Sequence, residues 1–212
     1  TSEPGIHTAA VGGPTMVLRS AGLTEAGVVT QIRTDGAESN VVIESFAQQP
    51  LVRPNVSLHR YSPLALSTAV LLPHEHDGSP LPVLLDPYAG PHAQRVLRAQ
   101  GSYLTSQWFA DQGFAVVITD GRGTPGRGSE WERAVHRDLA TAVLDDQVAA
   151  LHAAALDYPL DLSRVAIRGW SFGGYLAALA VLRCEALHNH AAPFTETVVV
   201  TVNAAECNRL RC

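Results

Sequence analysis

The chain has 212 residues, 46% of them hydrophobic, and a formal net charge of −5. This apolar content is enough for a buried core, so we expect a globular protein. The 15 basic residues are scattered and are outnumbered by 20 acidic ones, which argues against a surface for nucleic acid or anionic membrane.

The first part of the chain, residues 1–60, predicts a small antiparallel β-meander. Turn signals such as "AGLTEAG" and "TDGAESN" separate short β-rich runs at roughly ten-residue intervals. These runs are "TMVLRS", "GVVTQIR" and "NVVIESF". A sheet this small leaves one face bare, so we expect it to join a larger β assembly or to pack on the later part of the chain. The proline-containing stretch "FAQQPLVRPNVSLHRYSP" is predicted to be a connector.

From about residue 66 the pattern changes to apolar runs that alternate with helical stretches. The runs are "LSTAVLLP", "LPVLLD", "FAVVITD" and "RVAIRG", and one helical stretch covers "SYLTSQWFADQG". Strands that are apolar on both faces are typical of a parallel sheet covered by helices on both sides. The sequence therefore predicts an α/β three-layer sandwich with a mostly parallel sheet.

A long helix is predicted over residues 138–157. Its apolar side chains fall near one face, which we expect to be buried, and its polar ones near the other. The apolar set is Leu139, Val143, Val148, Leu151 and Ala155, and the polar set is Asp145, Asp146 and Gln147.

A glycine-rich loop follows "AVVITD", where Gly121, Gly123 and Gly126 have the G-x-G-x-x-G spacing of dinucleotide-binding turns. Pro125 removes one backbone donor, however, and the acidic residues about 20 positions on lie on a helix rather than at the end of a strand. We therefore predict a structural loop at the carboxyl edge of the sheet, without a nucleotide cofactor.

The three cysteines, Cys184, Cys207 and Cys212, all lie near the end of the chain. An odd count does not form a closed disulfide framework, which favours a reducing compartment. Together with His188 and His190 these residues could offer metal ligands, but their spacing fits no standard zinc motif. We expect no metal and no other cofactor.

The beginning of the chain, "TSEPGIHTAAVGG", lacks the basic-then-apolar order of a signal peptide. No apolar run approaches the ~18 residues that span a bilayer. A cytoplasmic protein without a membrane partner is therefore expected.

The most informative motif is G-x-S-x-G, formed by Gly169, Ser171 and Gly173 in "RGWSFGGY". The strand "RVAIRG" precedes it and the helix-prone "YLAALAVLR" follows it, which is the setting of a nucleophile elbow. In an elbow the serine hydroxyl stands above the sheet, and the backbone N–H of Phe172 faces it from the amino end of the helix.

Three motifs in order, "LLDPYAGP", "DGRG" and "GWSFGGY", resemble the hydrolase domain of the prolyl oligopeptidase family, nearest its dipeptidyl peptidase IV-like branch. The resemblance covers roughly residues 60–183 and implies a partial α/β-hydrolase. It implies Ser171 as nucleophile, with the Phe172 N–H and the Tyr88 hydroxyl as oxyanion donors. Trp170 and Tyr175 would line the acyl-side pocket. By the same resemblance, the β-rich first part would be the end of a β-propeller, and the substrate a short or proline-containing peptide.

The end of the chain departs from this pattern. In α/β-hydrolases the acid and the histidine follow the serine on later loops, each after a further strand–helix unit of roughly 30 residues, and too few residues follow Ser171. His136 and His152 precede it, and His188 and His190 come directly after the elbow helix. We therefore expect the acid and the histidine to be absent from this chain, and the chain to be inactive alone.

The predicted organisation is a β-rich segment (1–60), a truncated hydrolase domain (61–183) and an atypical tail (184–212) in which "TETVVVTV" could form a strand. The predicted function is that of a serine peptidase. Two alternatives stay open: a non-catalytic remnant or interaction module whose sheet edge pairs with another chain, in an oligomer for example, and an esterase of the same fold.

Overall fold

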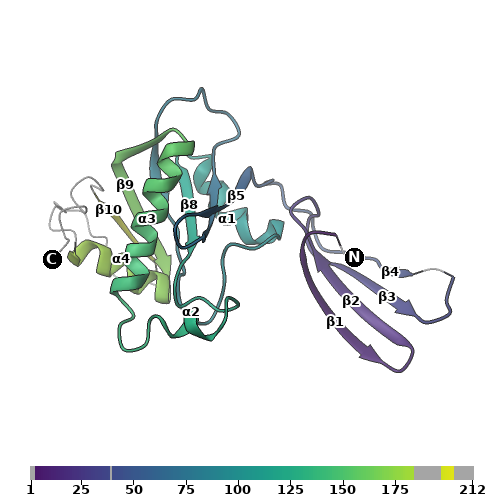
Figure 1. The fold of residues 1–212 in the computed structure, drawn as a ribbon. Helices are drawn as coiled ribbons and strands as arrows, with labels where there is room; N and C mark the ends of the chain where they lie inside the picture. The colour runs from purple at the N-terminus through teal and green to yellow at the C-terminus, as the bar shows by residue number, and fades with distance from the viewer. Residues whose placement is uncertain (1–2, 39, 184–196, 203–212) are drawn as a thin grey trace. The chain divides into compact units, whose positions relative to one another are not determined.

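The computed structural model describes residues 3–38, 40–183 and 197–202, and Figure 1 shows how their helices and strands are arranged. The chain divides into two compact units. One contains Thr1–Pro54 and Leu97–Thr105, and the other contains Asn55–Val96 and Ser106–Cys212.

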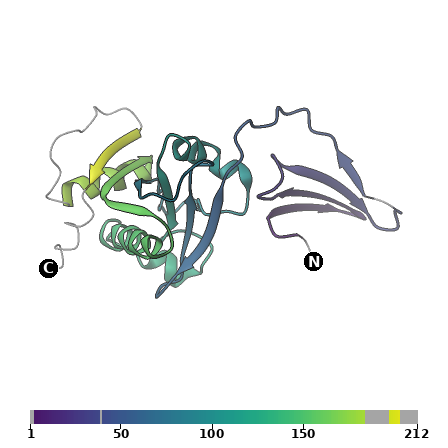
Figure 2. The ribbon, with the colours of Figure 1, turned by 90° about the horizontal axis from the view of Figure 1, so that it is seen from above.

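The first unit contains a four-stranded antiparallel sheet, whose purple to blue strands lie side by side in Figure 2. The strand order is the order in the chain, which confirms the predicted antiparallel meander. The strands are β1 (Ile6–Gly12), β2 (Thr15–Ala21), β3 (Val29–Thr34) and β4 (Val41–Ile43). Strand β1 was not among the predicted runs. A short 3-10 helix, η1 (Gln100–Tyr103), joins this unit, where the Gln100 N–H donates to the Gly22 carbonyl over 2.7 Å.

The second unit is built on a six-stranded sheet in the order β10-β9-β7-β8-β6-β5. Its strands are β5 (Val56–Tyr61), β6 (Leu66–Leu71), β7 (Leu81–Leu85), β8 (Ala115–Asp120), β9 (Leu160–Trp170) and β10 (Thr197–Val202). The prediction of a mostly parallel sheet was wrong. Only β7 pairs in parallel with β8 and β9, while β5–β6, β6–β8 and β9–β10 are antiparallel, so the sheet is mixed.

Two strands of this sheet come from the predicted connector and from the tail. The predicted connector contains β5, which pairs with β6 along its whole length, so this part of the connector is a strand of the sheet. Two of the connector's three prolines, Pro54 and Pro63, lie just outside the strand and leave the β5–β6 hydrogen bonds intact. The tail segment "TETVVVTV" supplies β10, as the sequence allowed.

Helices cover both faces of the sheet. On one face, α3 (Thr141–Asp157) and α4 (Phe172–Arg183) lie against the central strands (Figure 1). They pack on residues that alternate along these strands, such as Val83 and Leu85 of β7. The other face meets α1 (Leu104–Ala110), whose Phe109 ring lies 4.4 Å from the guanidinium carbon of Arg168 on β9. A short helix, α2 (Ser129–Arg133), follows β8. The core on the α3 and α4 face consists of Val83, Leu85, Val117, Leu151, Val165, Ile167, Ala177 and Ala180.

The face that α3 buries differs from the predicted one. Val143 and Leu151 are buried as expected, but so are Asp146 and Gln147, while Leu139 lies before the helix and is 46% exposed. Both polar side chains have partners, because Asp146 pairs with Arg122 and the Gln147 amide donates to the Thr119 carbonyl. A helix pattern that assigns all polar residues to solvent misses such paired groups.

We expect Asp138 to stabilise the start of α3 in a pH-dependent way. Its carboxylate accepts hydrogen bonds from the backbone N–H groups of Ala140 and Thr141, both over 2.9 Å, and these bonds lower its pKa to about 2. The contribution is therefore complete above about pH 4 and is lost as the pH falls from 4 to 2. Asp138→Ala should lower the urea midpoint at pH 7 but have little effect near pH 2. Asp145→Ala, at an exposed position on α3, is the control, and equal pH profiles for the two variants would refute the role.

Among the described residues, no helix is both long enough and apolar enough to cross a membrane.

Candidate active site

Ser171 lies between the end of β9 and the beginning of α4, exposed to solvent. Its φ angle is 53°, in the left-handed region that residues other than glycine rarely adopt. The helix begins immediately, because the Tyr175 N–H donates to the Ser171 carbonyl over 3.1 Å. Strain of this kind persists only where the surroundings hold it, and it is concentrated at functional sites.

The two motif glycines let the backbone make this sharp turn. A Cβ atom on Gly169 would collide with the backbone of Gly173, and a Cβ atom on Gly173 would collide with the Pro87 carbonyl oxygen. Both positions are therefore closed to any side chain. The second contact also joins the serine turn to the loop that follows β7.

This loop, residues 86–96, carries Tyr88 and is called the Tyr88 loop below. It begins where the Asp86 N–H continues the β7–β8 pairing, donating to the Val117 carbonyl over 3.0 Å. Tyr88 is half-buried, and its ring centroid lies 6.4 Å from that of Phe172. Ala89, at a φ of 53°, is buried in a cluster with Leu176 of α4. The structure thus brings Tyr88 and the start of α4 together.

The remaining predicted site residues surround the same helix start. Phe172 is the first residue of α4, where backbone N–H groups have no partner within the helix and carry a partial positive charge. Trp170 is 55% exposed at the end of β9, and Tyr175 is 45% exposed in the first turn of α4. The Phe172 and Tyr175 rings pack with centroids 5.4 Å apart. The arrangement offers an exposed hydroxyl, backbone and phenol donors, and aromatic surface.

The glycine-rich loop after β8 is held by a salt bridge. The Arg122 guanidinium binds Asp146 on α3 with nitrogen–oxygen distances of 2.7 to 3.1 Å, and its backbone N–H donates to the same carboxylate. The Asp146 carboxylate raises the pKa of Arg122 and keeps it charged. The backbone N–H groups of Gly123 and Gly126 donate to the Trp131 carbonyl and the Glu132 side chain, so these donors of the loop bind groups of the protein itself.

No hydrogen bond joins Ser171 to a histidine or a carboxylate within the described ranges. His136 is exposed, and His152 lies on α3 with its Nε2 atom buried and unpaired. His188, His190 and the three cysteines lie outside the described residues. Within the described part of the chain, no group of histidines, cysteines and acidic residues could hold a metal.

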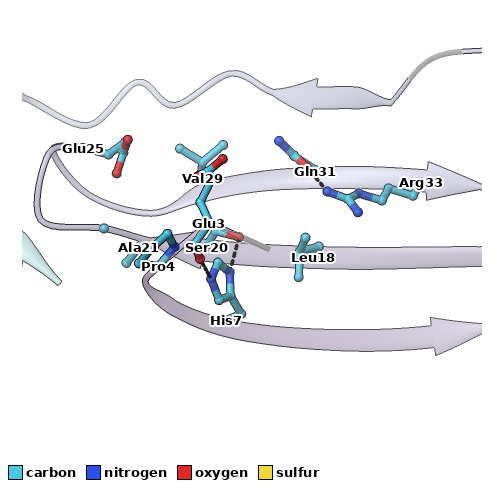
Figure 3. A pocket seen from close by; sticks show the side chains of 11 residues that line it. Glu3, Pro4, His7, Leu18, Ser20, Ala21, Glu25, Val29, Gln31 and Arg33 are labelled. Carbon is cyan, nitrogen blue, oxygen red and sulfur yellow. Dashed lines mark hydrogen bonds between the residues drawn. The ribbon is translucent and has the colours of Figure 1, made fainter. Parts of the chain in front are cut away.

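A separate hollow of about 290 Å³ lies on the sheet of the first unit (Figure 3). His7 contacts the Ser20 hydroxyl and the Glu3 carbonyl there, and Arg33 donates to the Gln31 side chain. Because these polar groups already bind one another, the hollow presents no convergent set of free groups, and the elbow is the stronger candidate.

Sequence reasoning singled out Ser171, Tyr88 and Phe172 but missed a buried carboxylate just after the end of β7, two residues before Tyr88. Asp86, directly before Pro87, is 2% exposed and contacts two arginines. The available signal was an acidic residue at the end of the apolar run "VLLD".

Comparisons with known proteins agree on one family. Residues 100–196 match the profile of the prolyl oligopeptidase family. The chain is 38% identical over 115 residues to dipeptidyl peptidase 8 of Mus musculus, and 34% identical over 113 residues to prolyl endopeptidase FAP of Homo sapiens. These matches cover 52% and 53% of this chain, and 13% and 15% of the relatives.

A solved structure shows the same fold. The crystal structure of Porphyromonas gingivalis dipeptidyl peptidase 4 matches with a TM-score of 0.69 and 25% sequence identity. The match covers 85% of this chain and 27% of that one. This chain therefore corresponds to a minor part of the length of its relatives.

Proposed function

We propose that the chain is part of a serine peptidase of the prolyl oligopeptidase family, in its dipeptidyl peptidase-like branch, and that it carries the nucleophile and the oxyanion donors. The match of residues 100–196 to the family profile and the likeness to dipeptidyl peptidase 8 and prolyl endopeptidase FAP support this proposal. The observation that carries the proposal is the strained Ser171, at a φ of 53° between β9 and α4, with the Tyr88 loop packed against the same turn.

In the proposed reaction the Ser171 oxygen attacks the carbonyl carbon of a peptide bond. A carbon–oxygen bond forms, and the carbonyl electrons move onto its oxygen. The Phe172 N–H and the Tyr88 hydroxyl stabilise this oxyanion. The proton of the Ser171 hydroxyl passes to the triad histidine, which this chain is expected to lack. Collapse of the intermediate breaks the carbon–nitrogen bond, the histidine gives that proton to the leaving amine, and water later hydrolyses the acyl-serine. In this proposal Trp170 and Tyr175, both exposed at the same helix start, line the pocket for the acyl side of the peptide.

The proposal extends to the rest of the domain by family resemblance. The acid and the histidine of the triad would stand on loops after later strands, and residues 1–60 would form the end of a β-propeller. Peptides that are short or contain proline are the proposed substrates, in keeping with the names of the relatives.

A thiol in place of the serine hydroxyl tests the oxyanion site without a general base, because a cysteine forms its own nucleophilic thiolate. Ser171→Cys would be made with Cys184, Cys207 and Cys212 replaced by serine. Two rates are measured: acylation by p-nitrophenyl acetate, which passes through an oxyanion, and alkylation by iodoacetamide, which does not. We expect the ratio of acylation to alkylation to exceed that of an ordinary exposed thiol by at least about 10²-fold, since each oxyanion donor contributes roughly that factor.

Ser163→Cys in the same background is the matched control, since Ser163 is an exposed serine on the same strand, β9. Equal ratios at positions 171 and 163 would show that the elbow stabilises no oxyanion and would refute the proposal.

A further inference from the structure

Asp86 joins three elements around the proposed oxyanion site. Its Oδ2 atom accepts a hydrogen bond from Arg95 Nη2 over 3.0 Å and another from the Ser106 hydroxyl of α1 over 2.8 Å. Its Oδ1 atom lies 3.6 Å from Arg168 Nε on β9. The Asp86 side chain is only 3% exposed, so these contacts are shielded from water.

The sheet register explains why these charges meet. Leu84 and Leu85 of β7 lie opposite Ala166 and Ile167 of β9, and the next step along both strands brings Asp86 beside Arg168. Side chains alternate between faces, so Asp86 and Arg168 point away from α3 and α4, toward α1. Arg168 lies three residues before Ser171. One carboxylate therefore connects the strand that leads to Tyr88 with the strand that leads to the nucleophile.

Hydrogen bonds also hold the far end of the Tyr88 loop, at Arg95 and Val96. Beyond Tyr88 the chain returns to Arg95, whose side chain binds Asp86. The backbone N–H groups of Arg95 and Val96 donate to the Asp120 carboxylate at the end of β8, over 2.8 to 3.0 Å. Asp120 is itself 2% exposed. The Tyr88 loop is thus closed at its base by two buried carboxylates, with Arg95 contacting both.

We propose that Asp86 is a positioning residue, which uses Arg95 and Arg168 to hold the Tyr88 loop in place relative to the Ser171 turn. The inference rests on the proposed function, because it assigns Asp86 an effect on the oxyanion that Tyr88 stabilises. Asp86 touches no reacting atom. Its effect passes through the position of the Tyr88 hydroxyl, and small displacements of such a donor are costly.

The test uses the acylation-to-alkylation ratio at position 171 in the Ser171→Cys background. Asp86→Asn should lower this ratio about tenfold, and Arg95→Met should lower it in the same direction. In a Tyr88→Phe background, Asp86→Asn should have almost no further effect, because the group it positions is gone. The Arg95 side chain is 30% exposed, so Arg95→Met is expected to fold. The ratio can therefore still be measured in this variant if Asp86→Asn does not fold.

Asp161→Asn is the matched control, since Asp161 is a less buried carboxylate that pairs with Arg164 on β9. It should leave the ratio unchanged. Hydrogen exchange over residues 87–96 should be faster in Asp86→Asn and Arg95→Met than in Asp161→Asn.

The outcomes separate the two proposals. If Tyr88→Phe lowers the ratio but Asp86→Asn and Arg95→Met do not, the positioning role is refuted and the proposed function stands. Equal losses from Asp86→Asn with and without the Tyr88 hydroxyl would also refute it, since a merely structural role predicts additive effects. If Tyr88→Phe has no effect, the oxyanion proposal fails and the positioning role fails with it.

Discussion

Peptidase turnover by a polypeptide of these 212 residues is expected to lie about 10⁶-fold below that of a serine peptidase with a complete triad. Attack by Ser171 requires that its hydroxyl proton be taken up, and no histidine or carboxylate among the described residues forms a hydrogen bond with it. Loss of the catalytic histidine alone costs about this factor in serine peptidases.

The measurement is release of p-nitroaniline from an Ala-Pro p-nitroanilide, with dipeptidyl peptidase 8 of Mus musculus as the active reference and Ser171→Ala as the background. A rate for the 212-residue polypeptide comparable to that of the reference would contradict the expectation. It would mean that a base reaches Ser171 from a part of the chain outside the described residues.

Loss of the Tyr88 hydroxyl is expected to slow acylation at position 171 by about 10²-fold to 10³-fold. In the Ser171→Cys background, Tyr88→Phe should reduce the reaction with p-nitrophenyl acetate and leave alkylation by iodoacetamide within about twofold. The first reaction builds negative charge on a carbonyl oxygen, whereas the second does not, so only the first reports a lost oxyanion donor.

Tyr158→Phe is the control for this prediction. Tyr158 belongs to the same unit but precedes β9, whereas Ser171 follows that strand, and the Tyr158 hydroxyl pairs with His59 Nε2 over 2.6 Å. Its variant should leave both rates unchanged. A loss of similar size in the two variants would indicate a change in packing rather than the loss of a specific donor.

Much of the fold could be predicted because apolar runs and turn residues are local signals. The runs that became β7 and β8 are apolar on both faces, and the sheet buries them between helices as that pattern indicates. The direction of pairing is not local. Strand β6 lies antiparallel between β5 and β8, and nothing within "LSTAVLLP" distinguishes that pairing from a parallel one. The mixed sheet was therefore missed.

Predictions for polar residues failed where they depended on distant partners. Asp146 was assigned to solvent because helix periodicity treats every carboxylate as exposed, yet it is buried and paired with Arg122 in the loop after β8. Asp86 is a similar case, since its partners Arg95, Ser106 and Arg168 come from three separate parts of the chain. Ser171 could be found because its glycines, strand and helix are contiguous in sequence.

The central claim is that the turn at Ser171 is built for nucleophilic attack. The most direct test is to treat the 212-residue chain with a fluorophosphonate probe and to map the labelled residues by mass spectrometry. We expect slow labelling that is selective for Ser171, since the Phe172 N–H and the Tyr88 hydroxyl would stabilise the charged phosphoryl oxygen even without a base. Labelling spread over other exposed serines at similar rates, or none at Ser171, would contradict the claim.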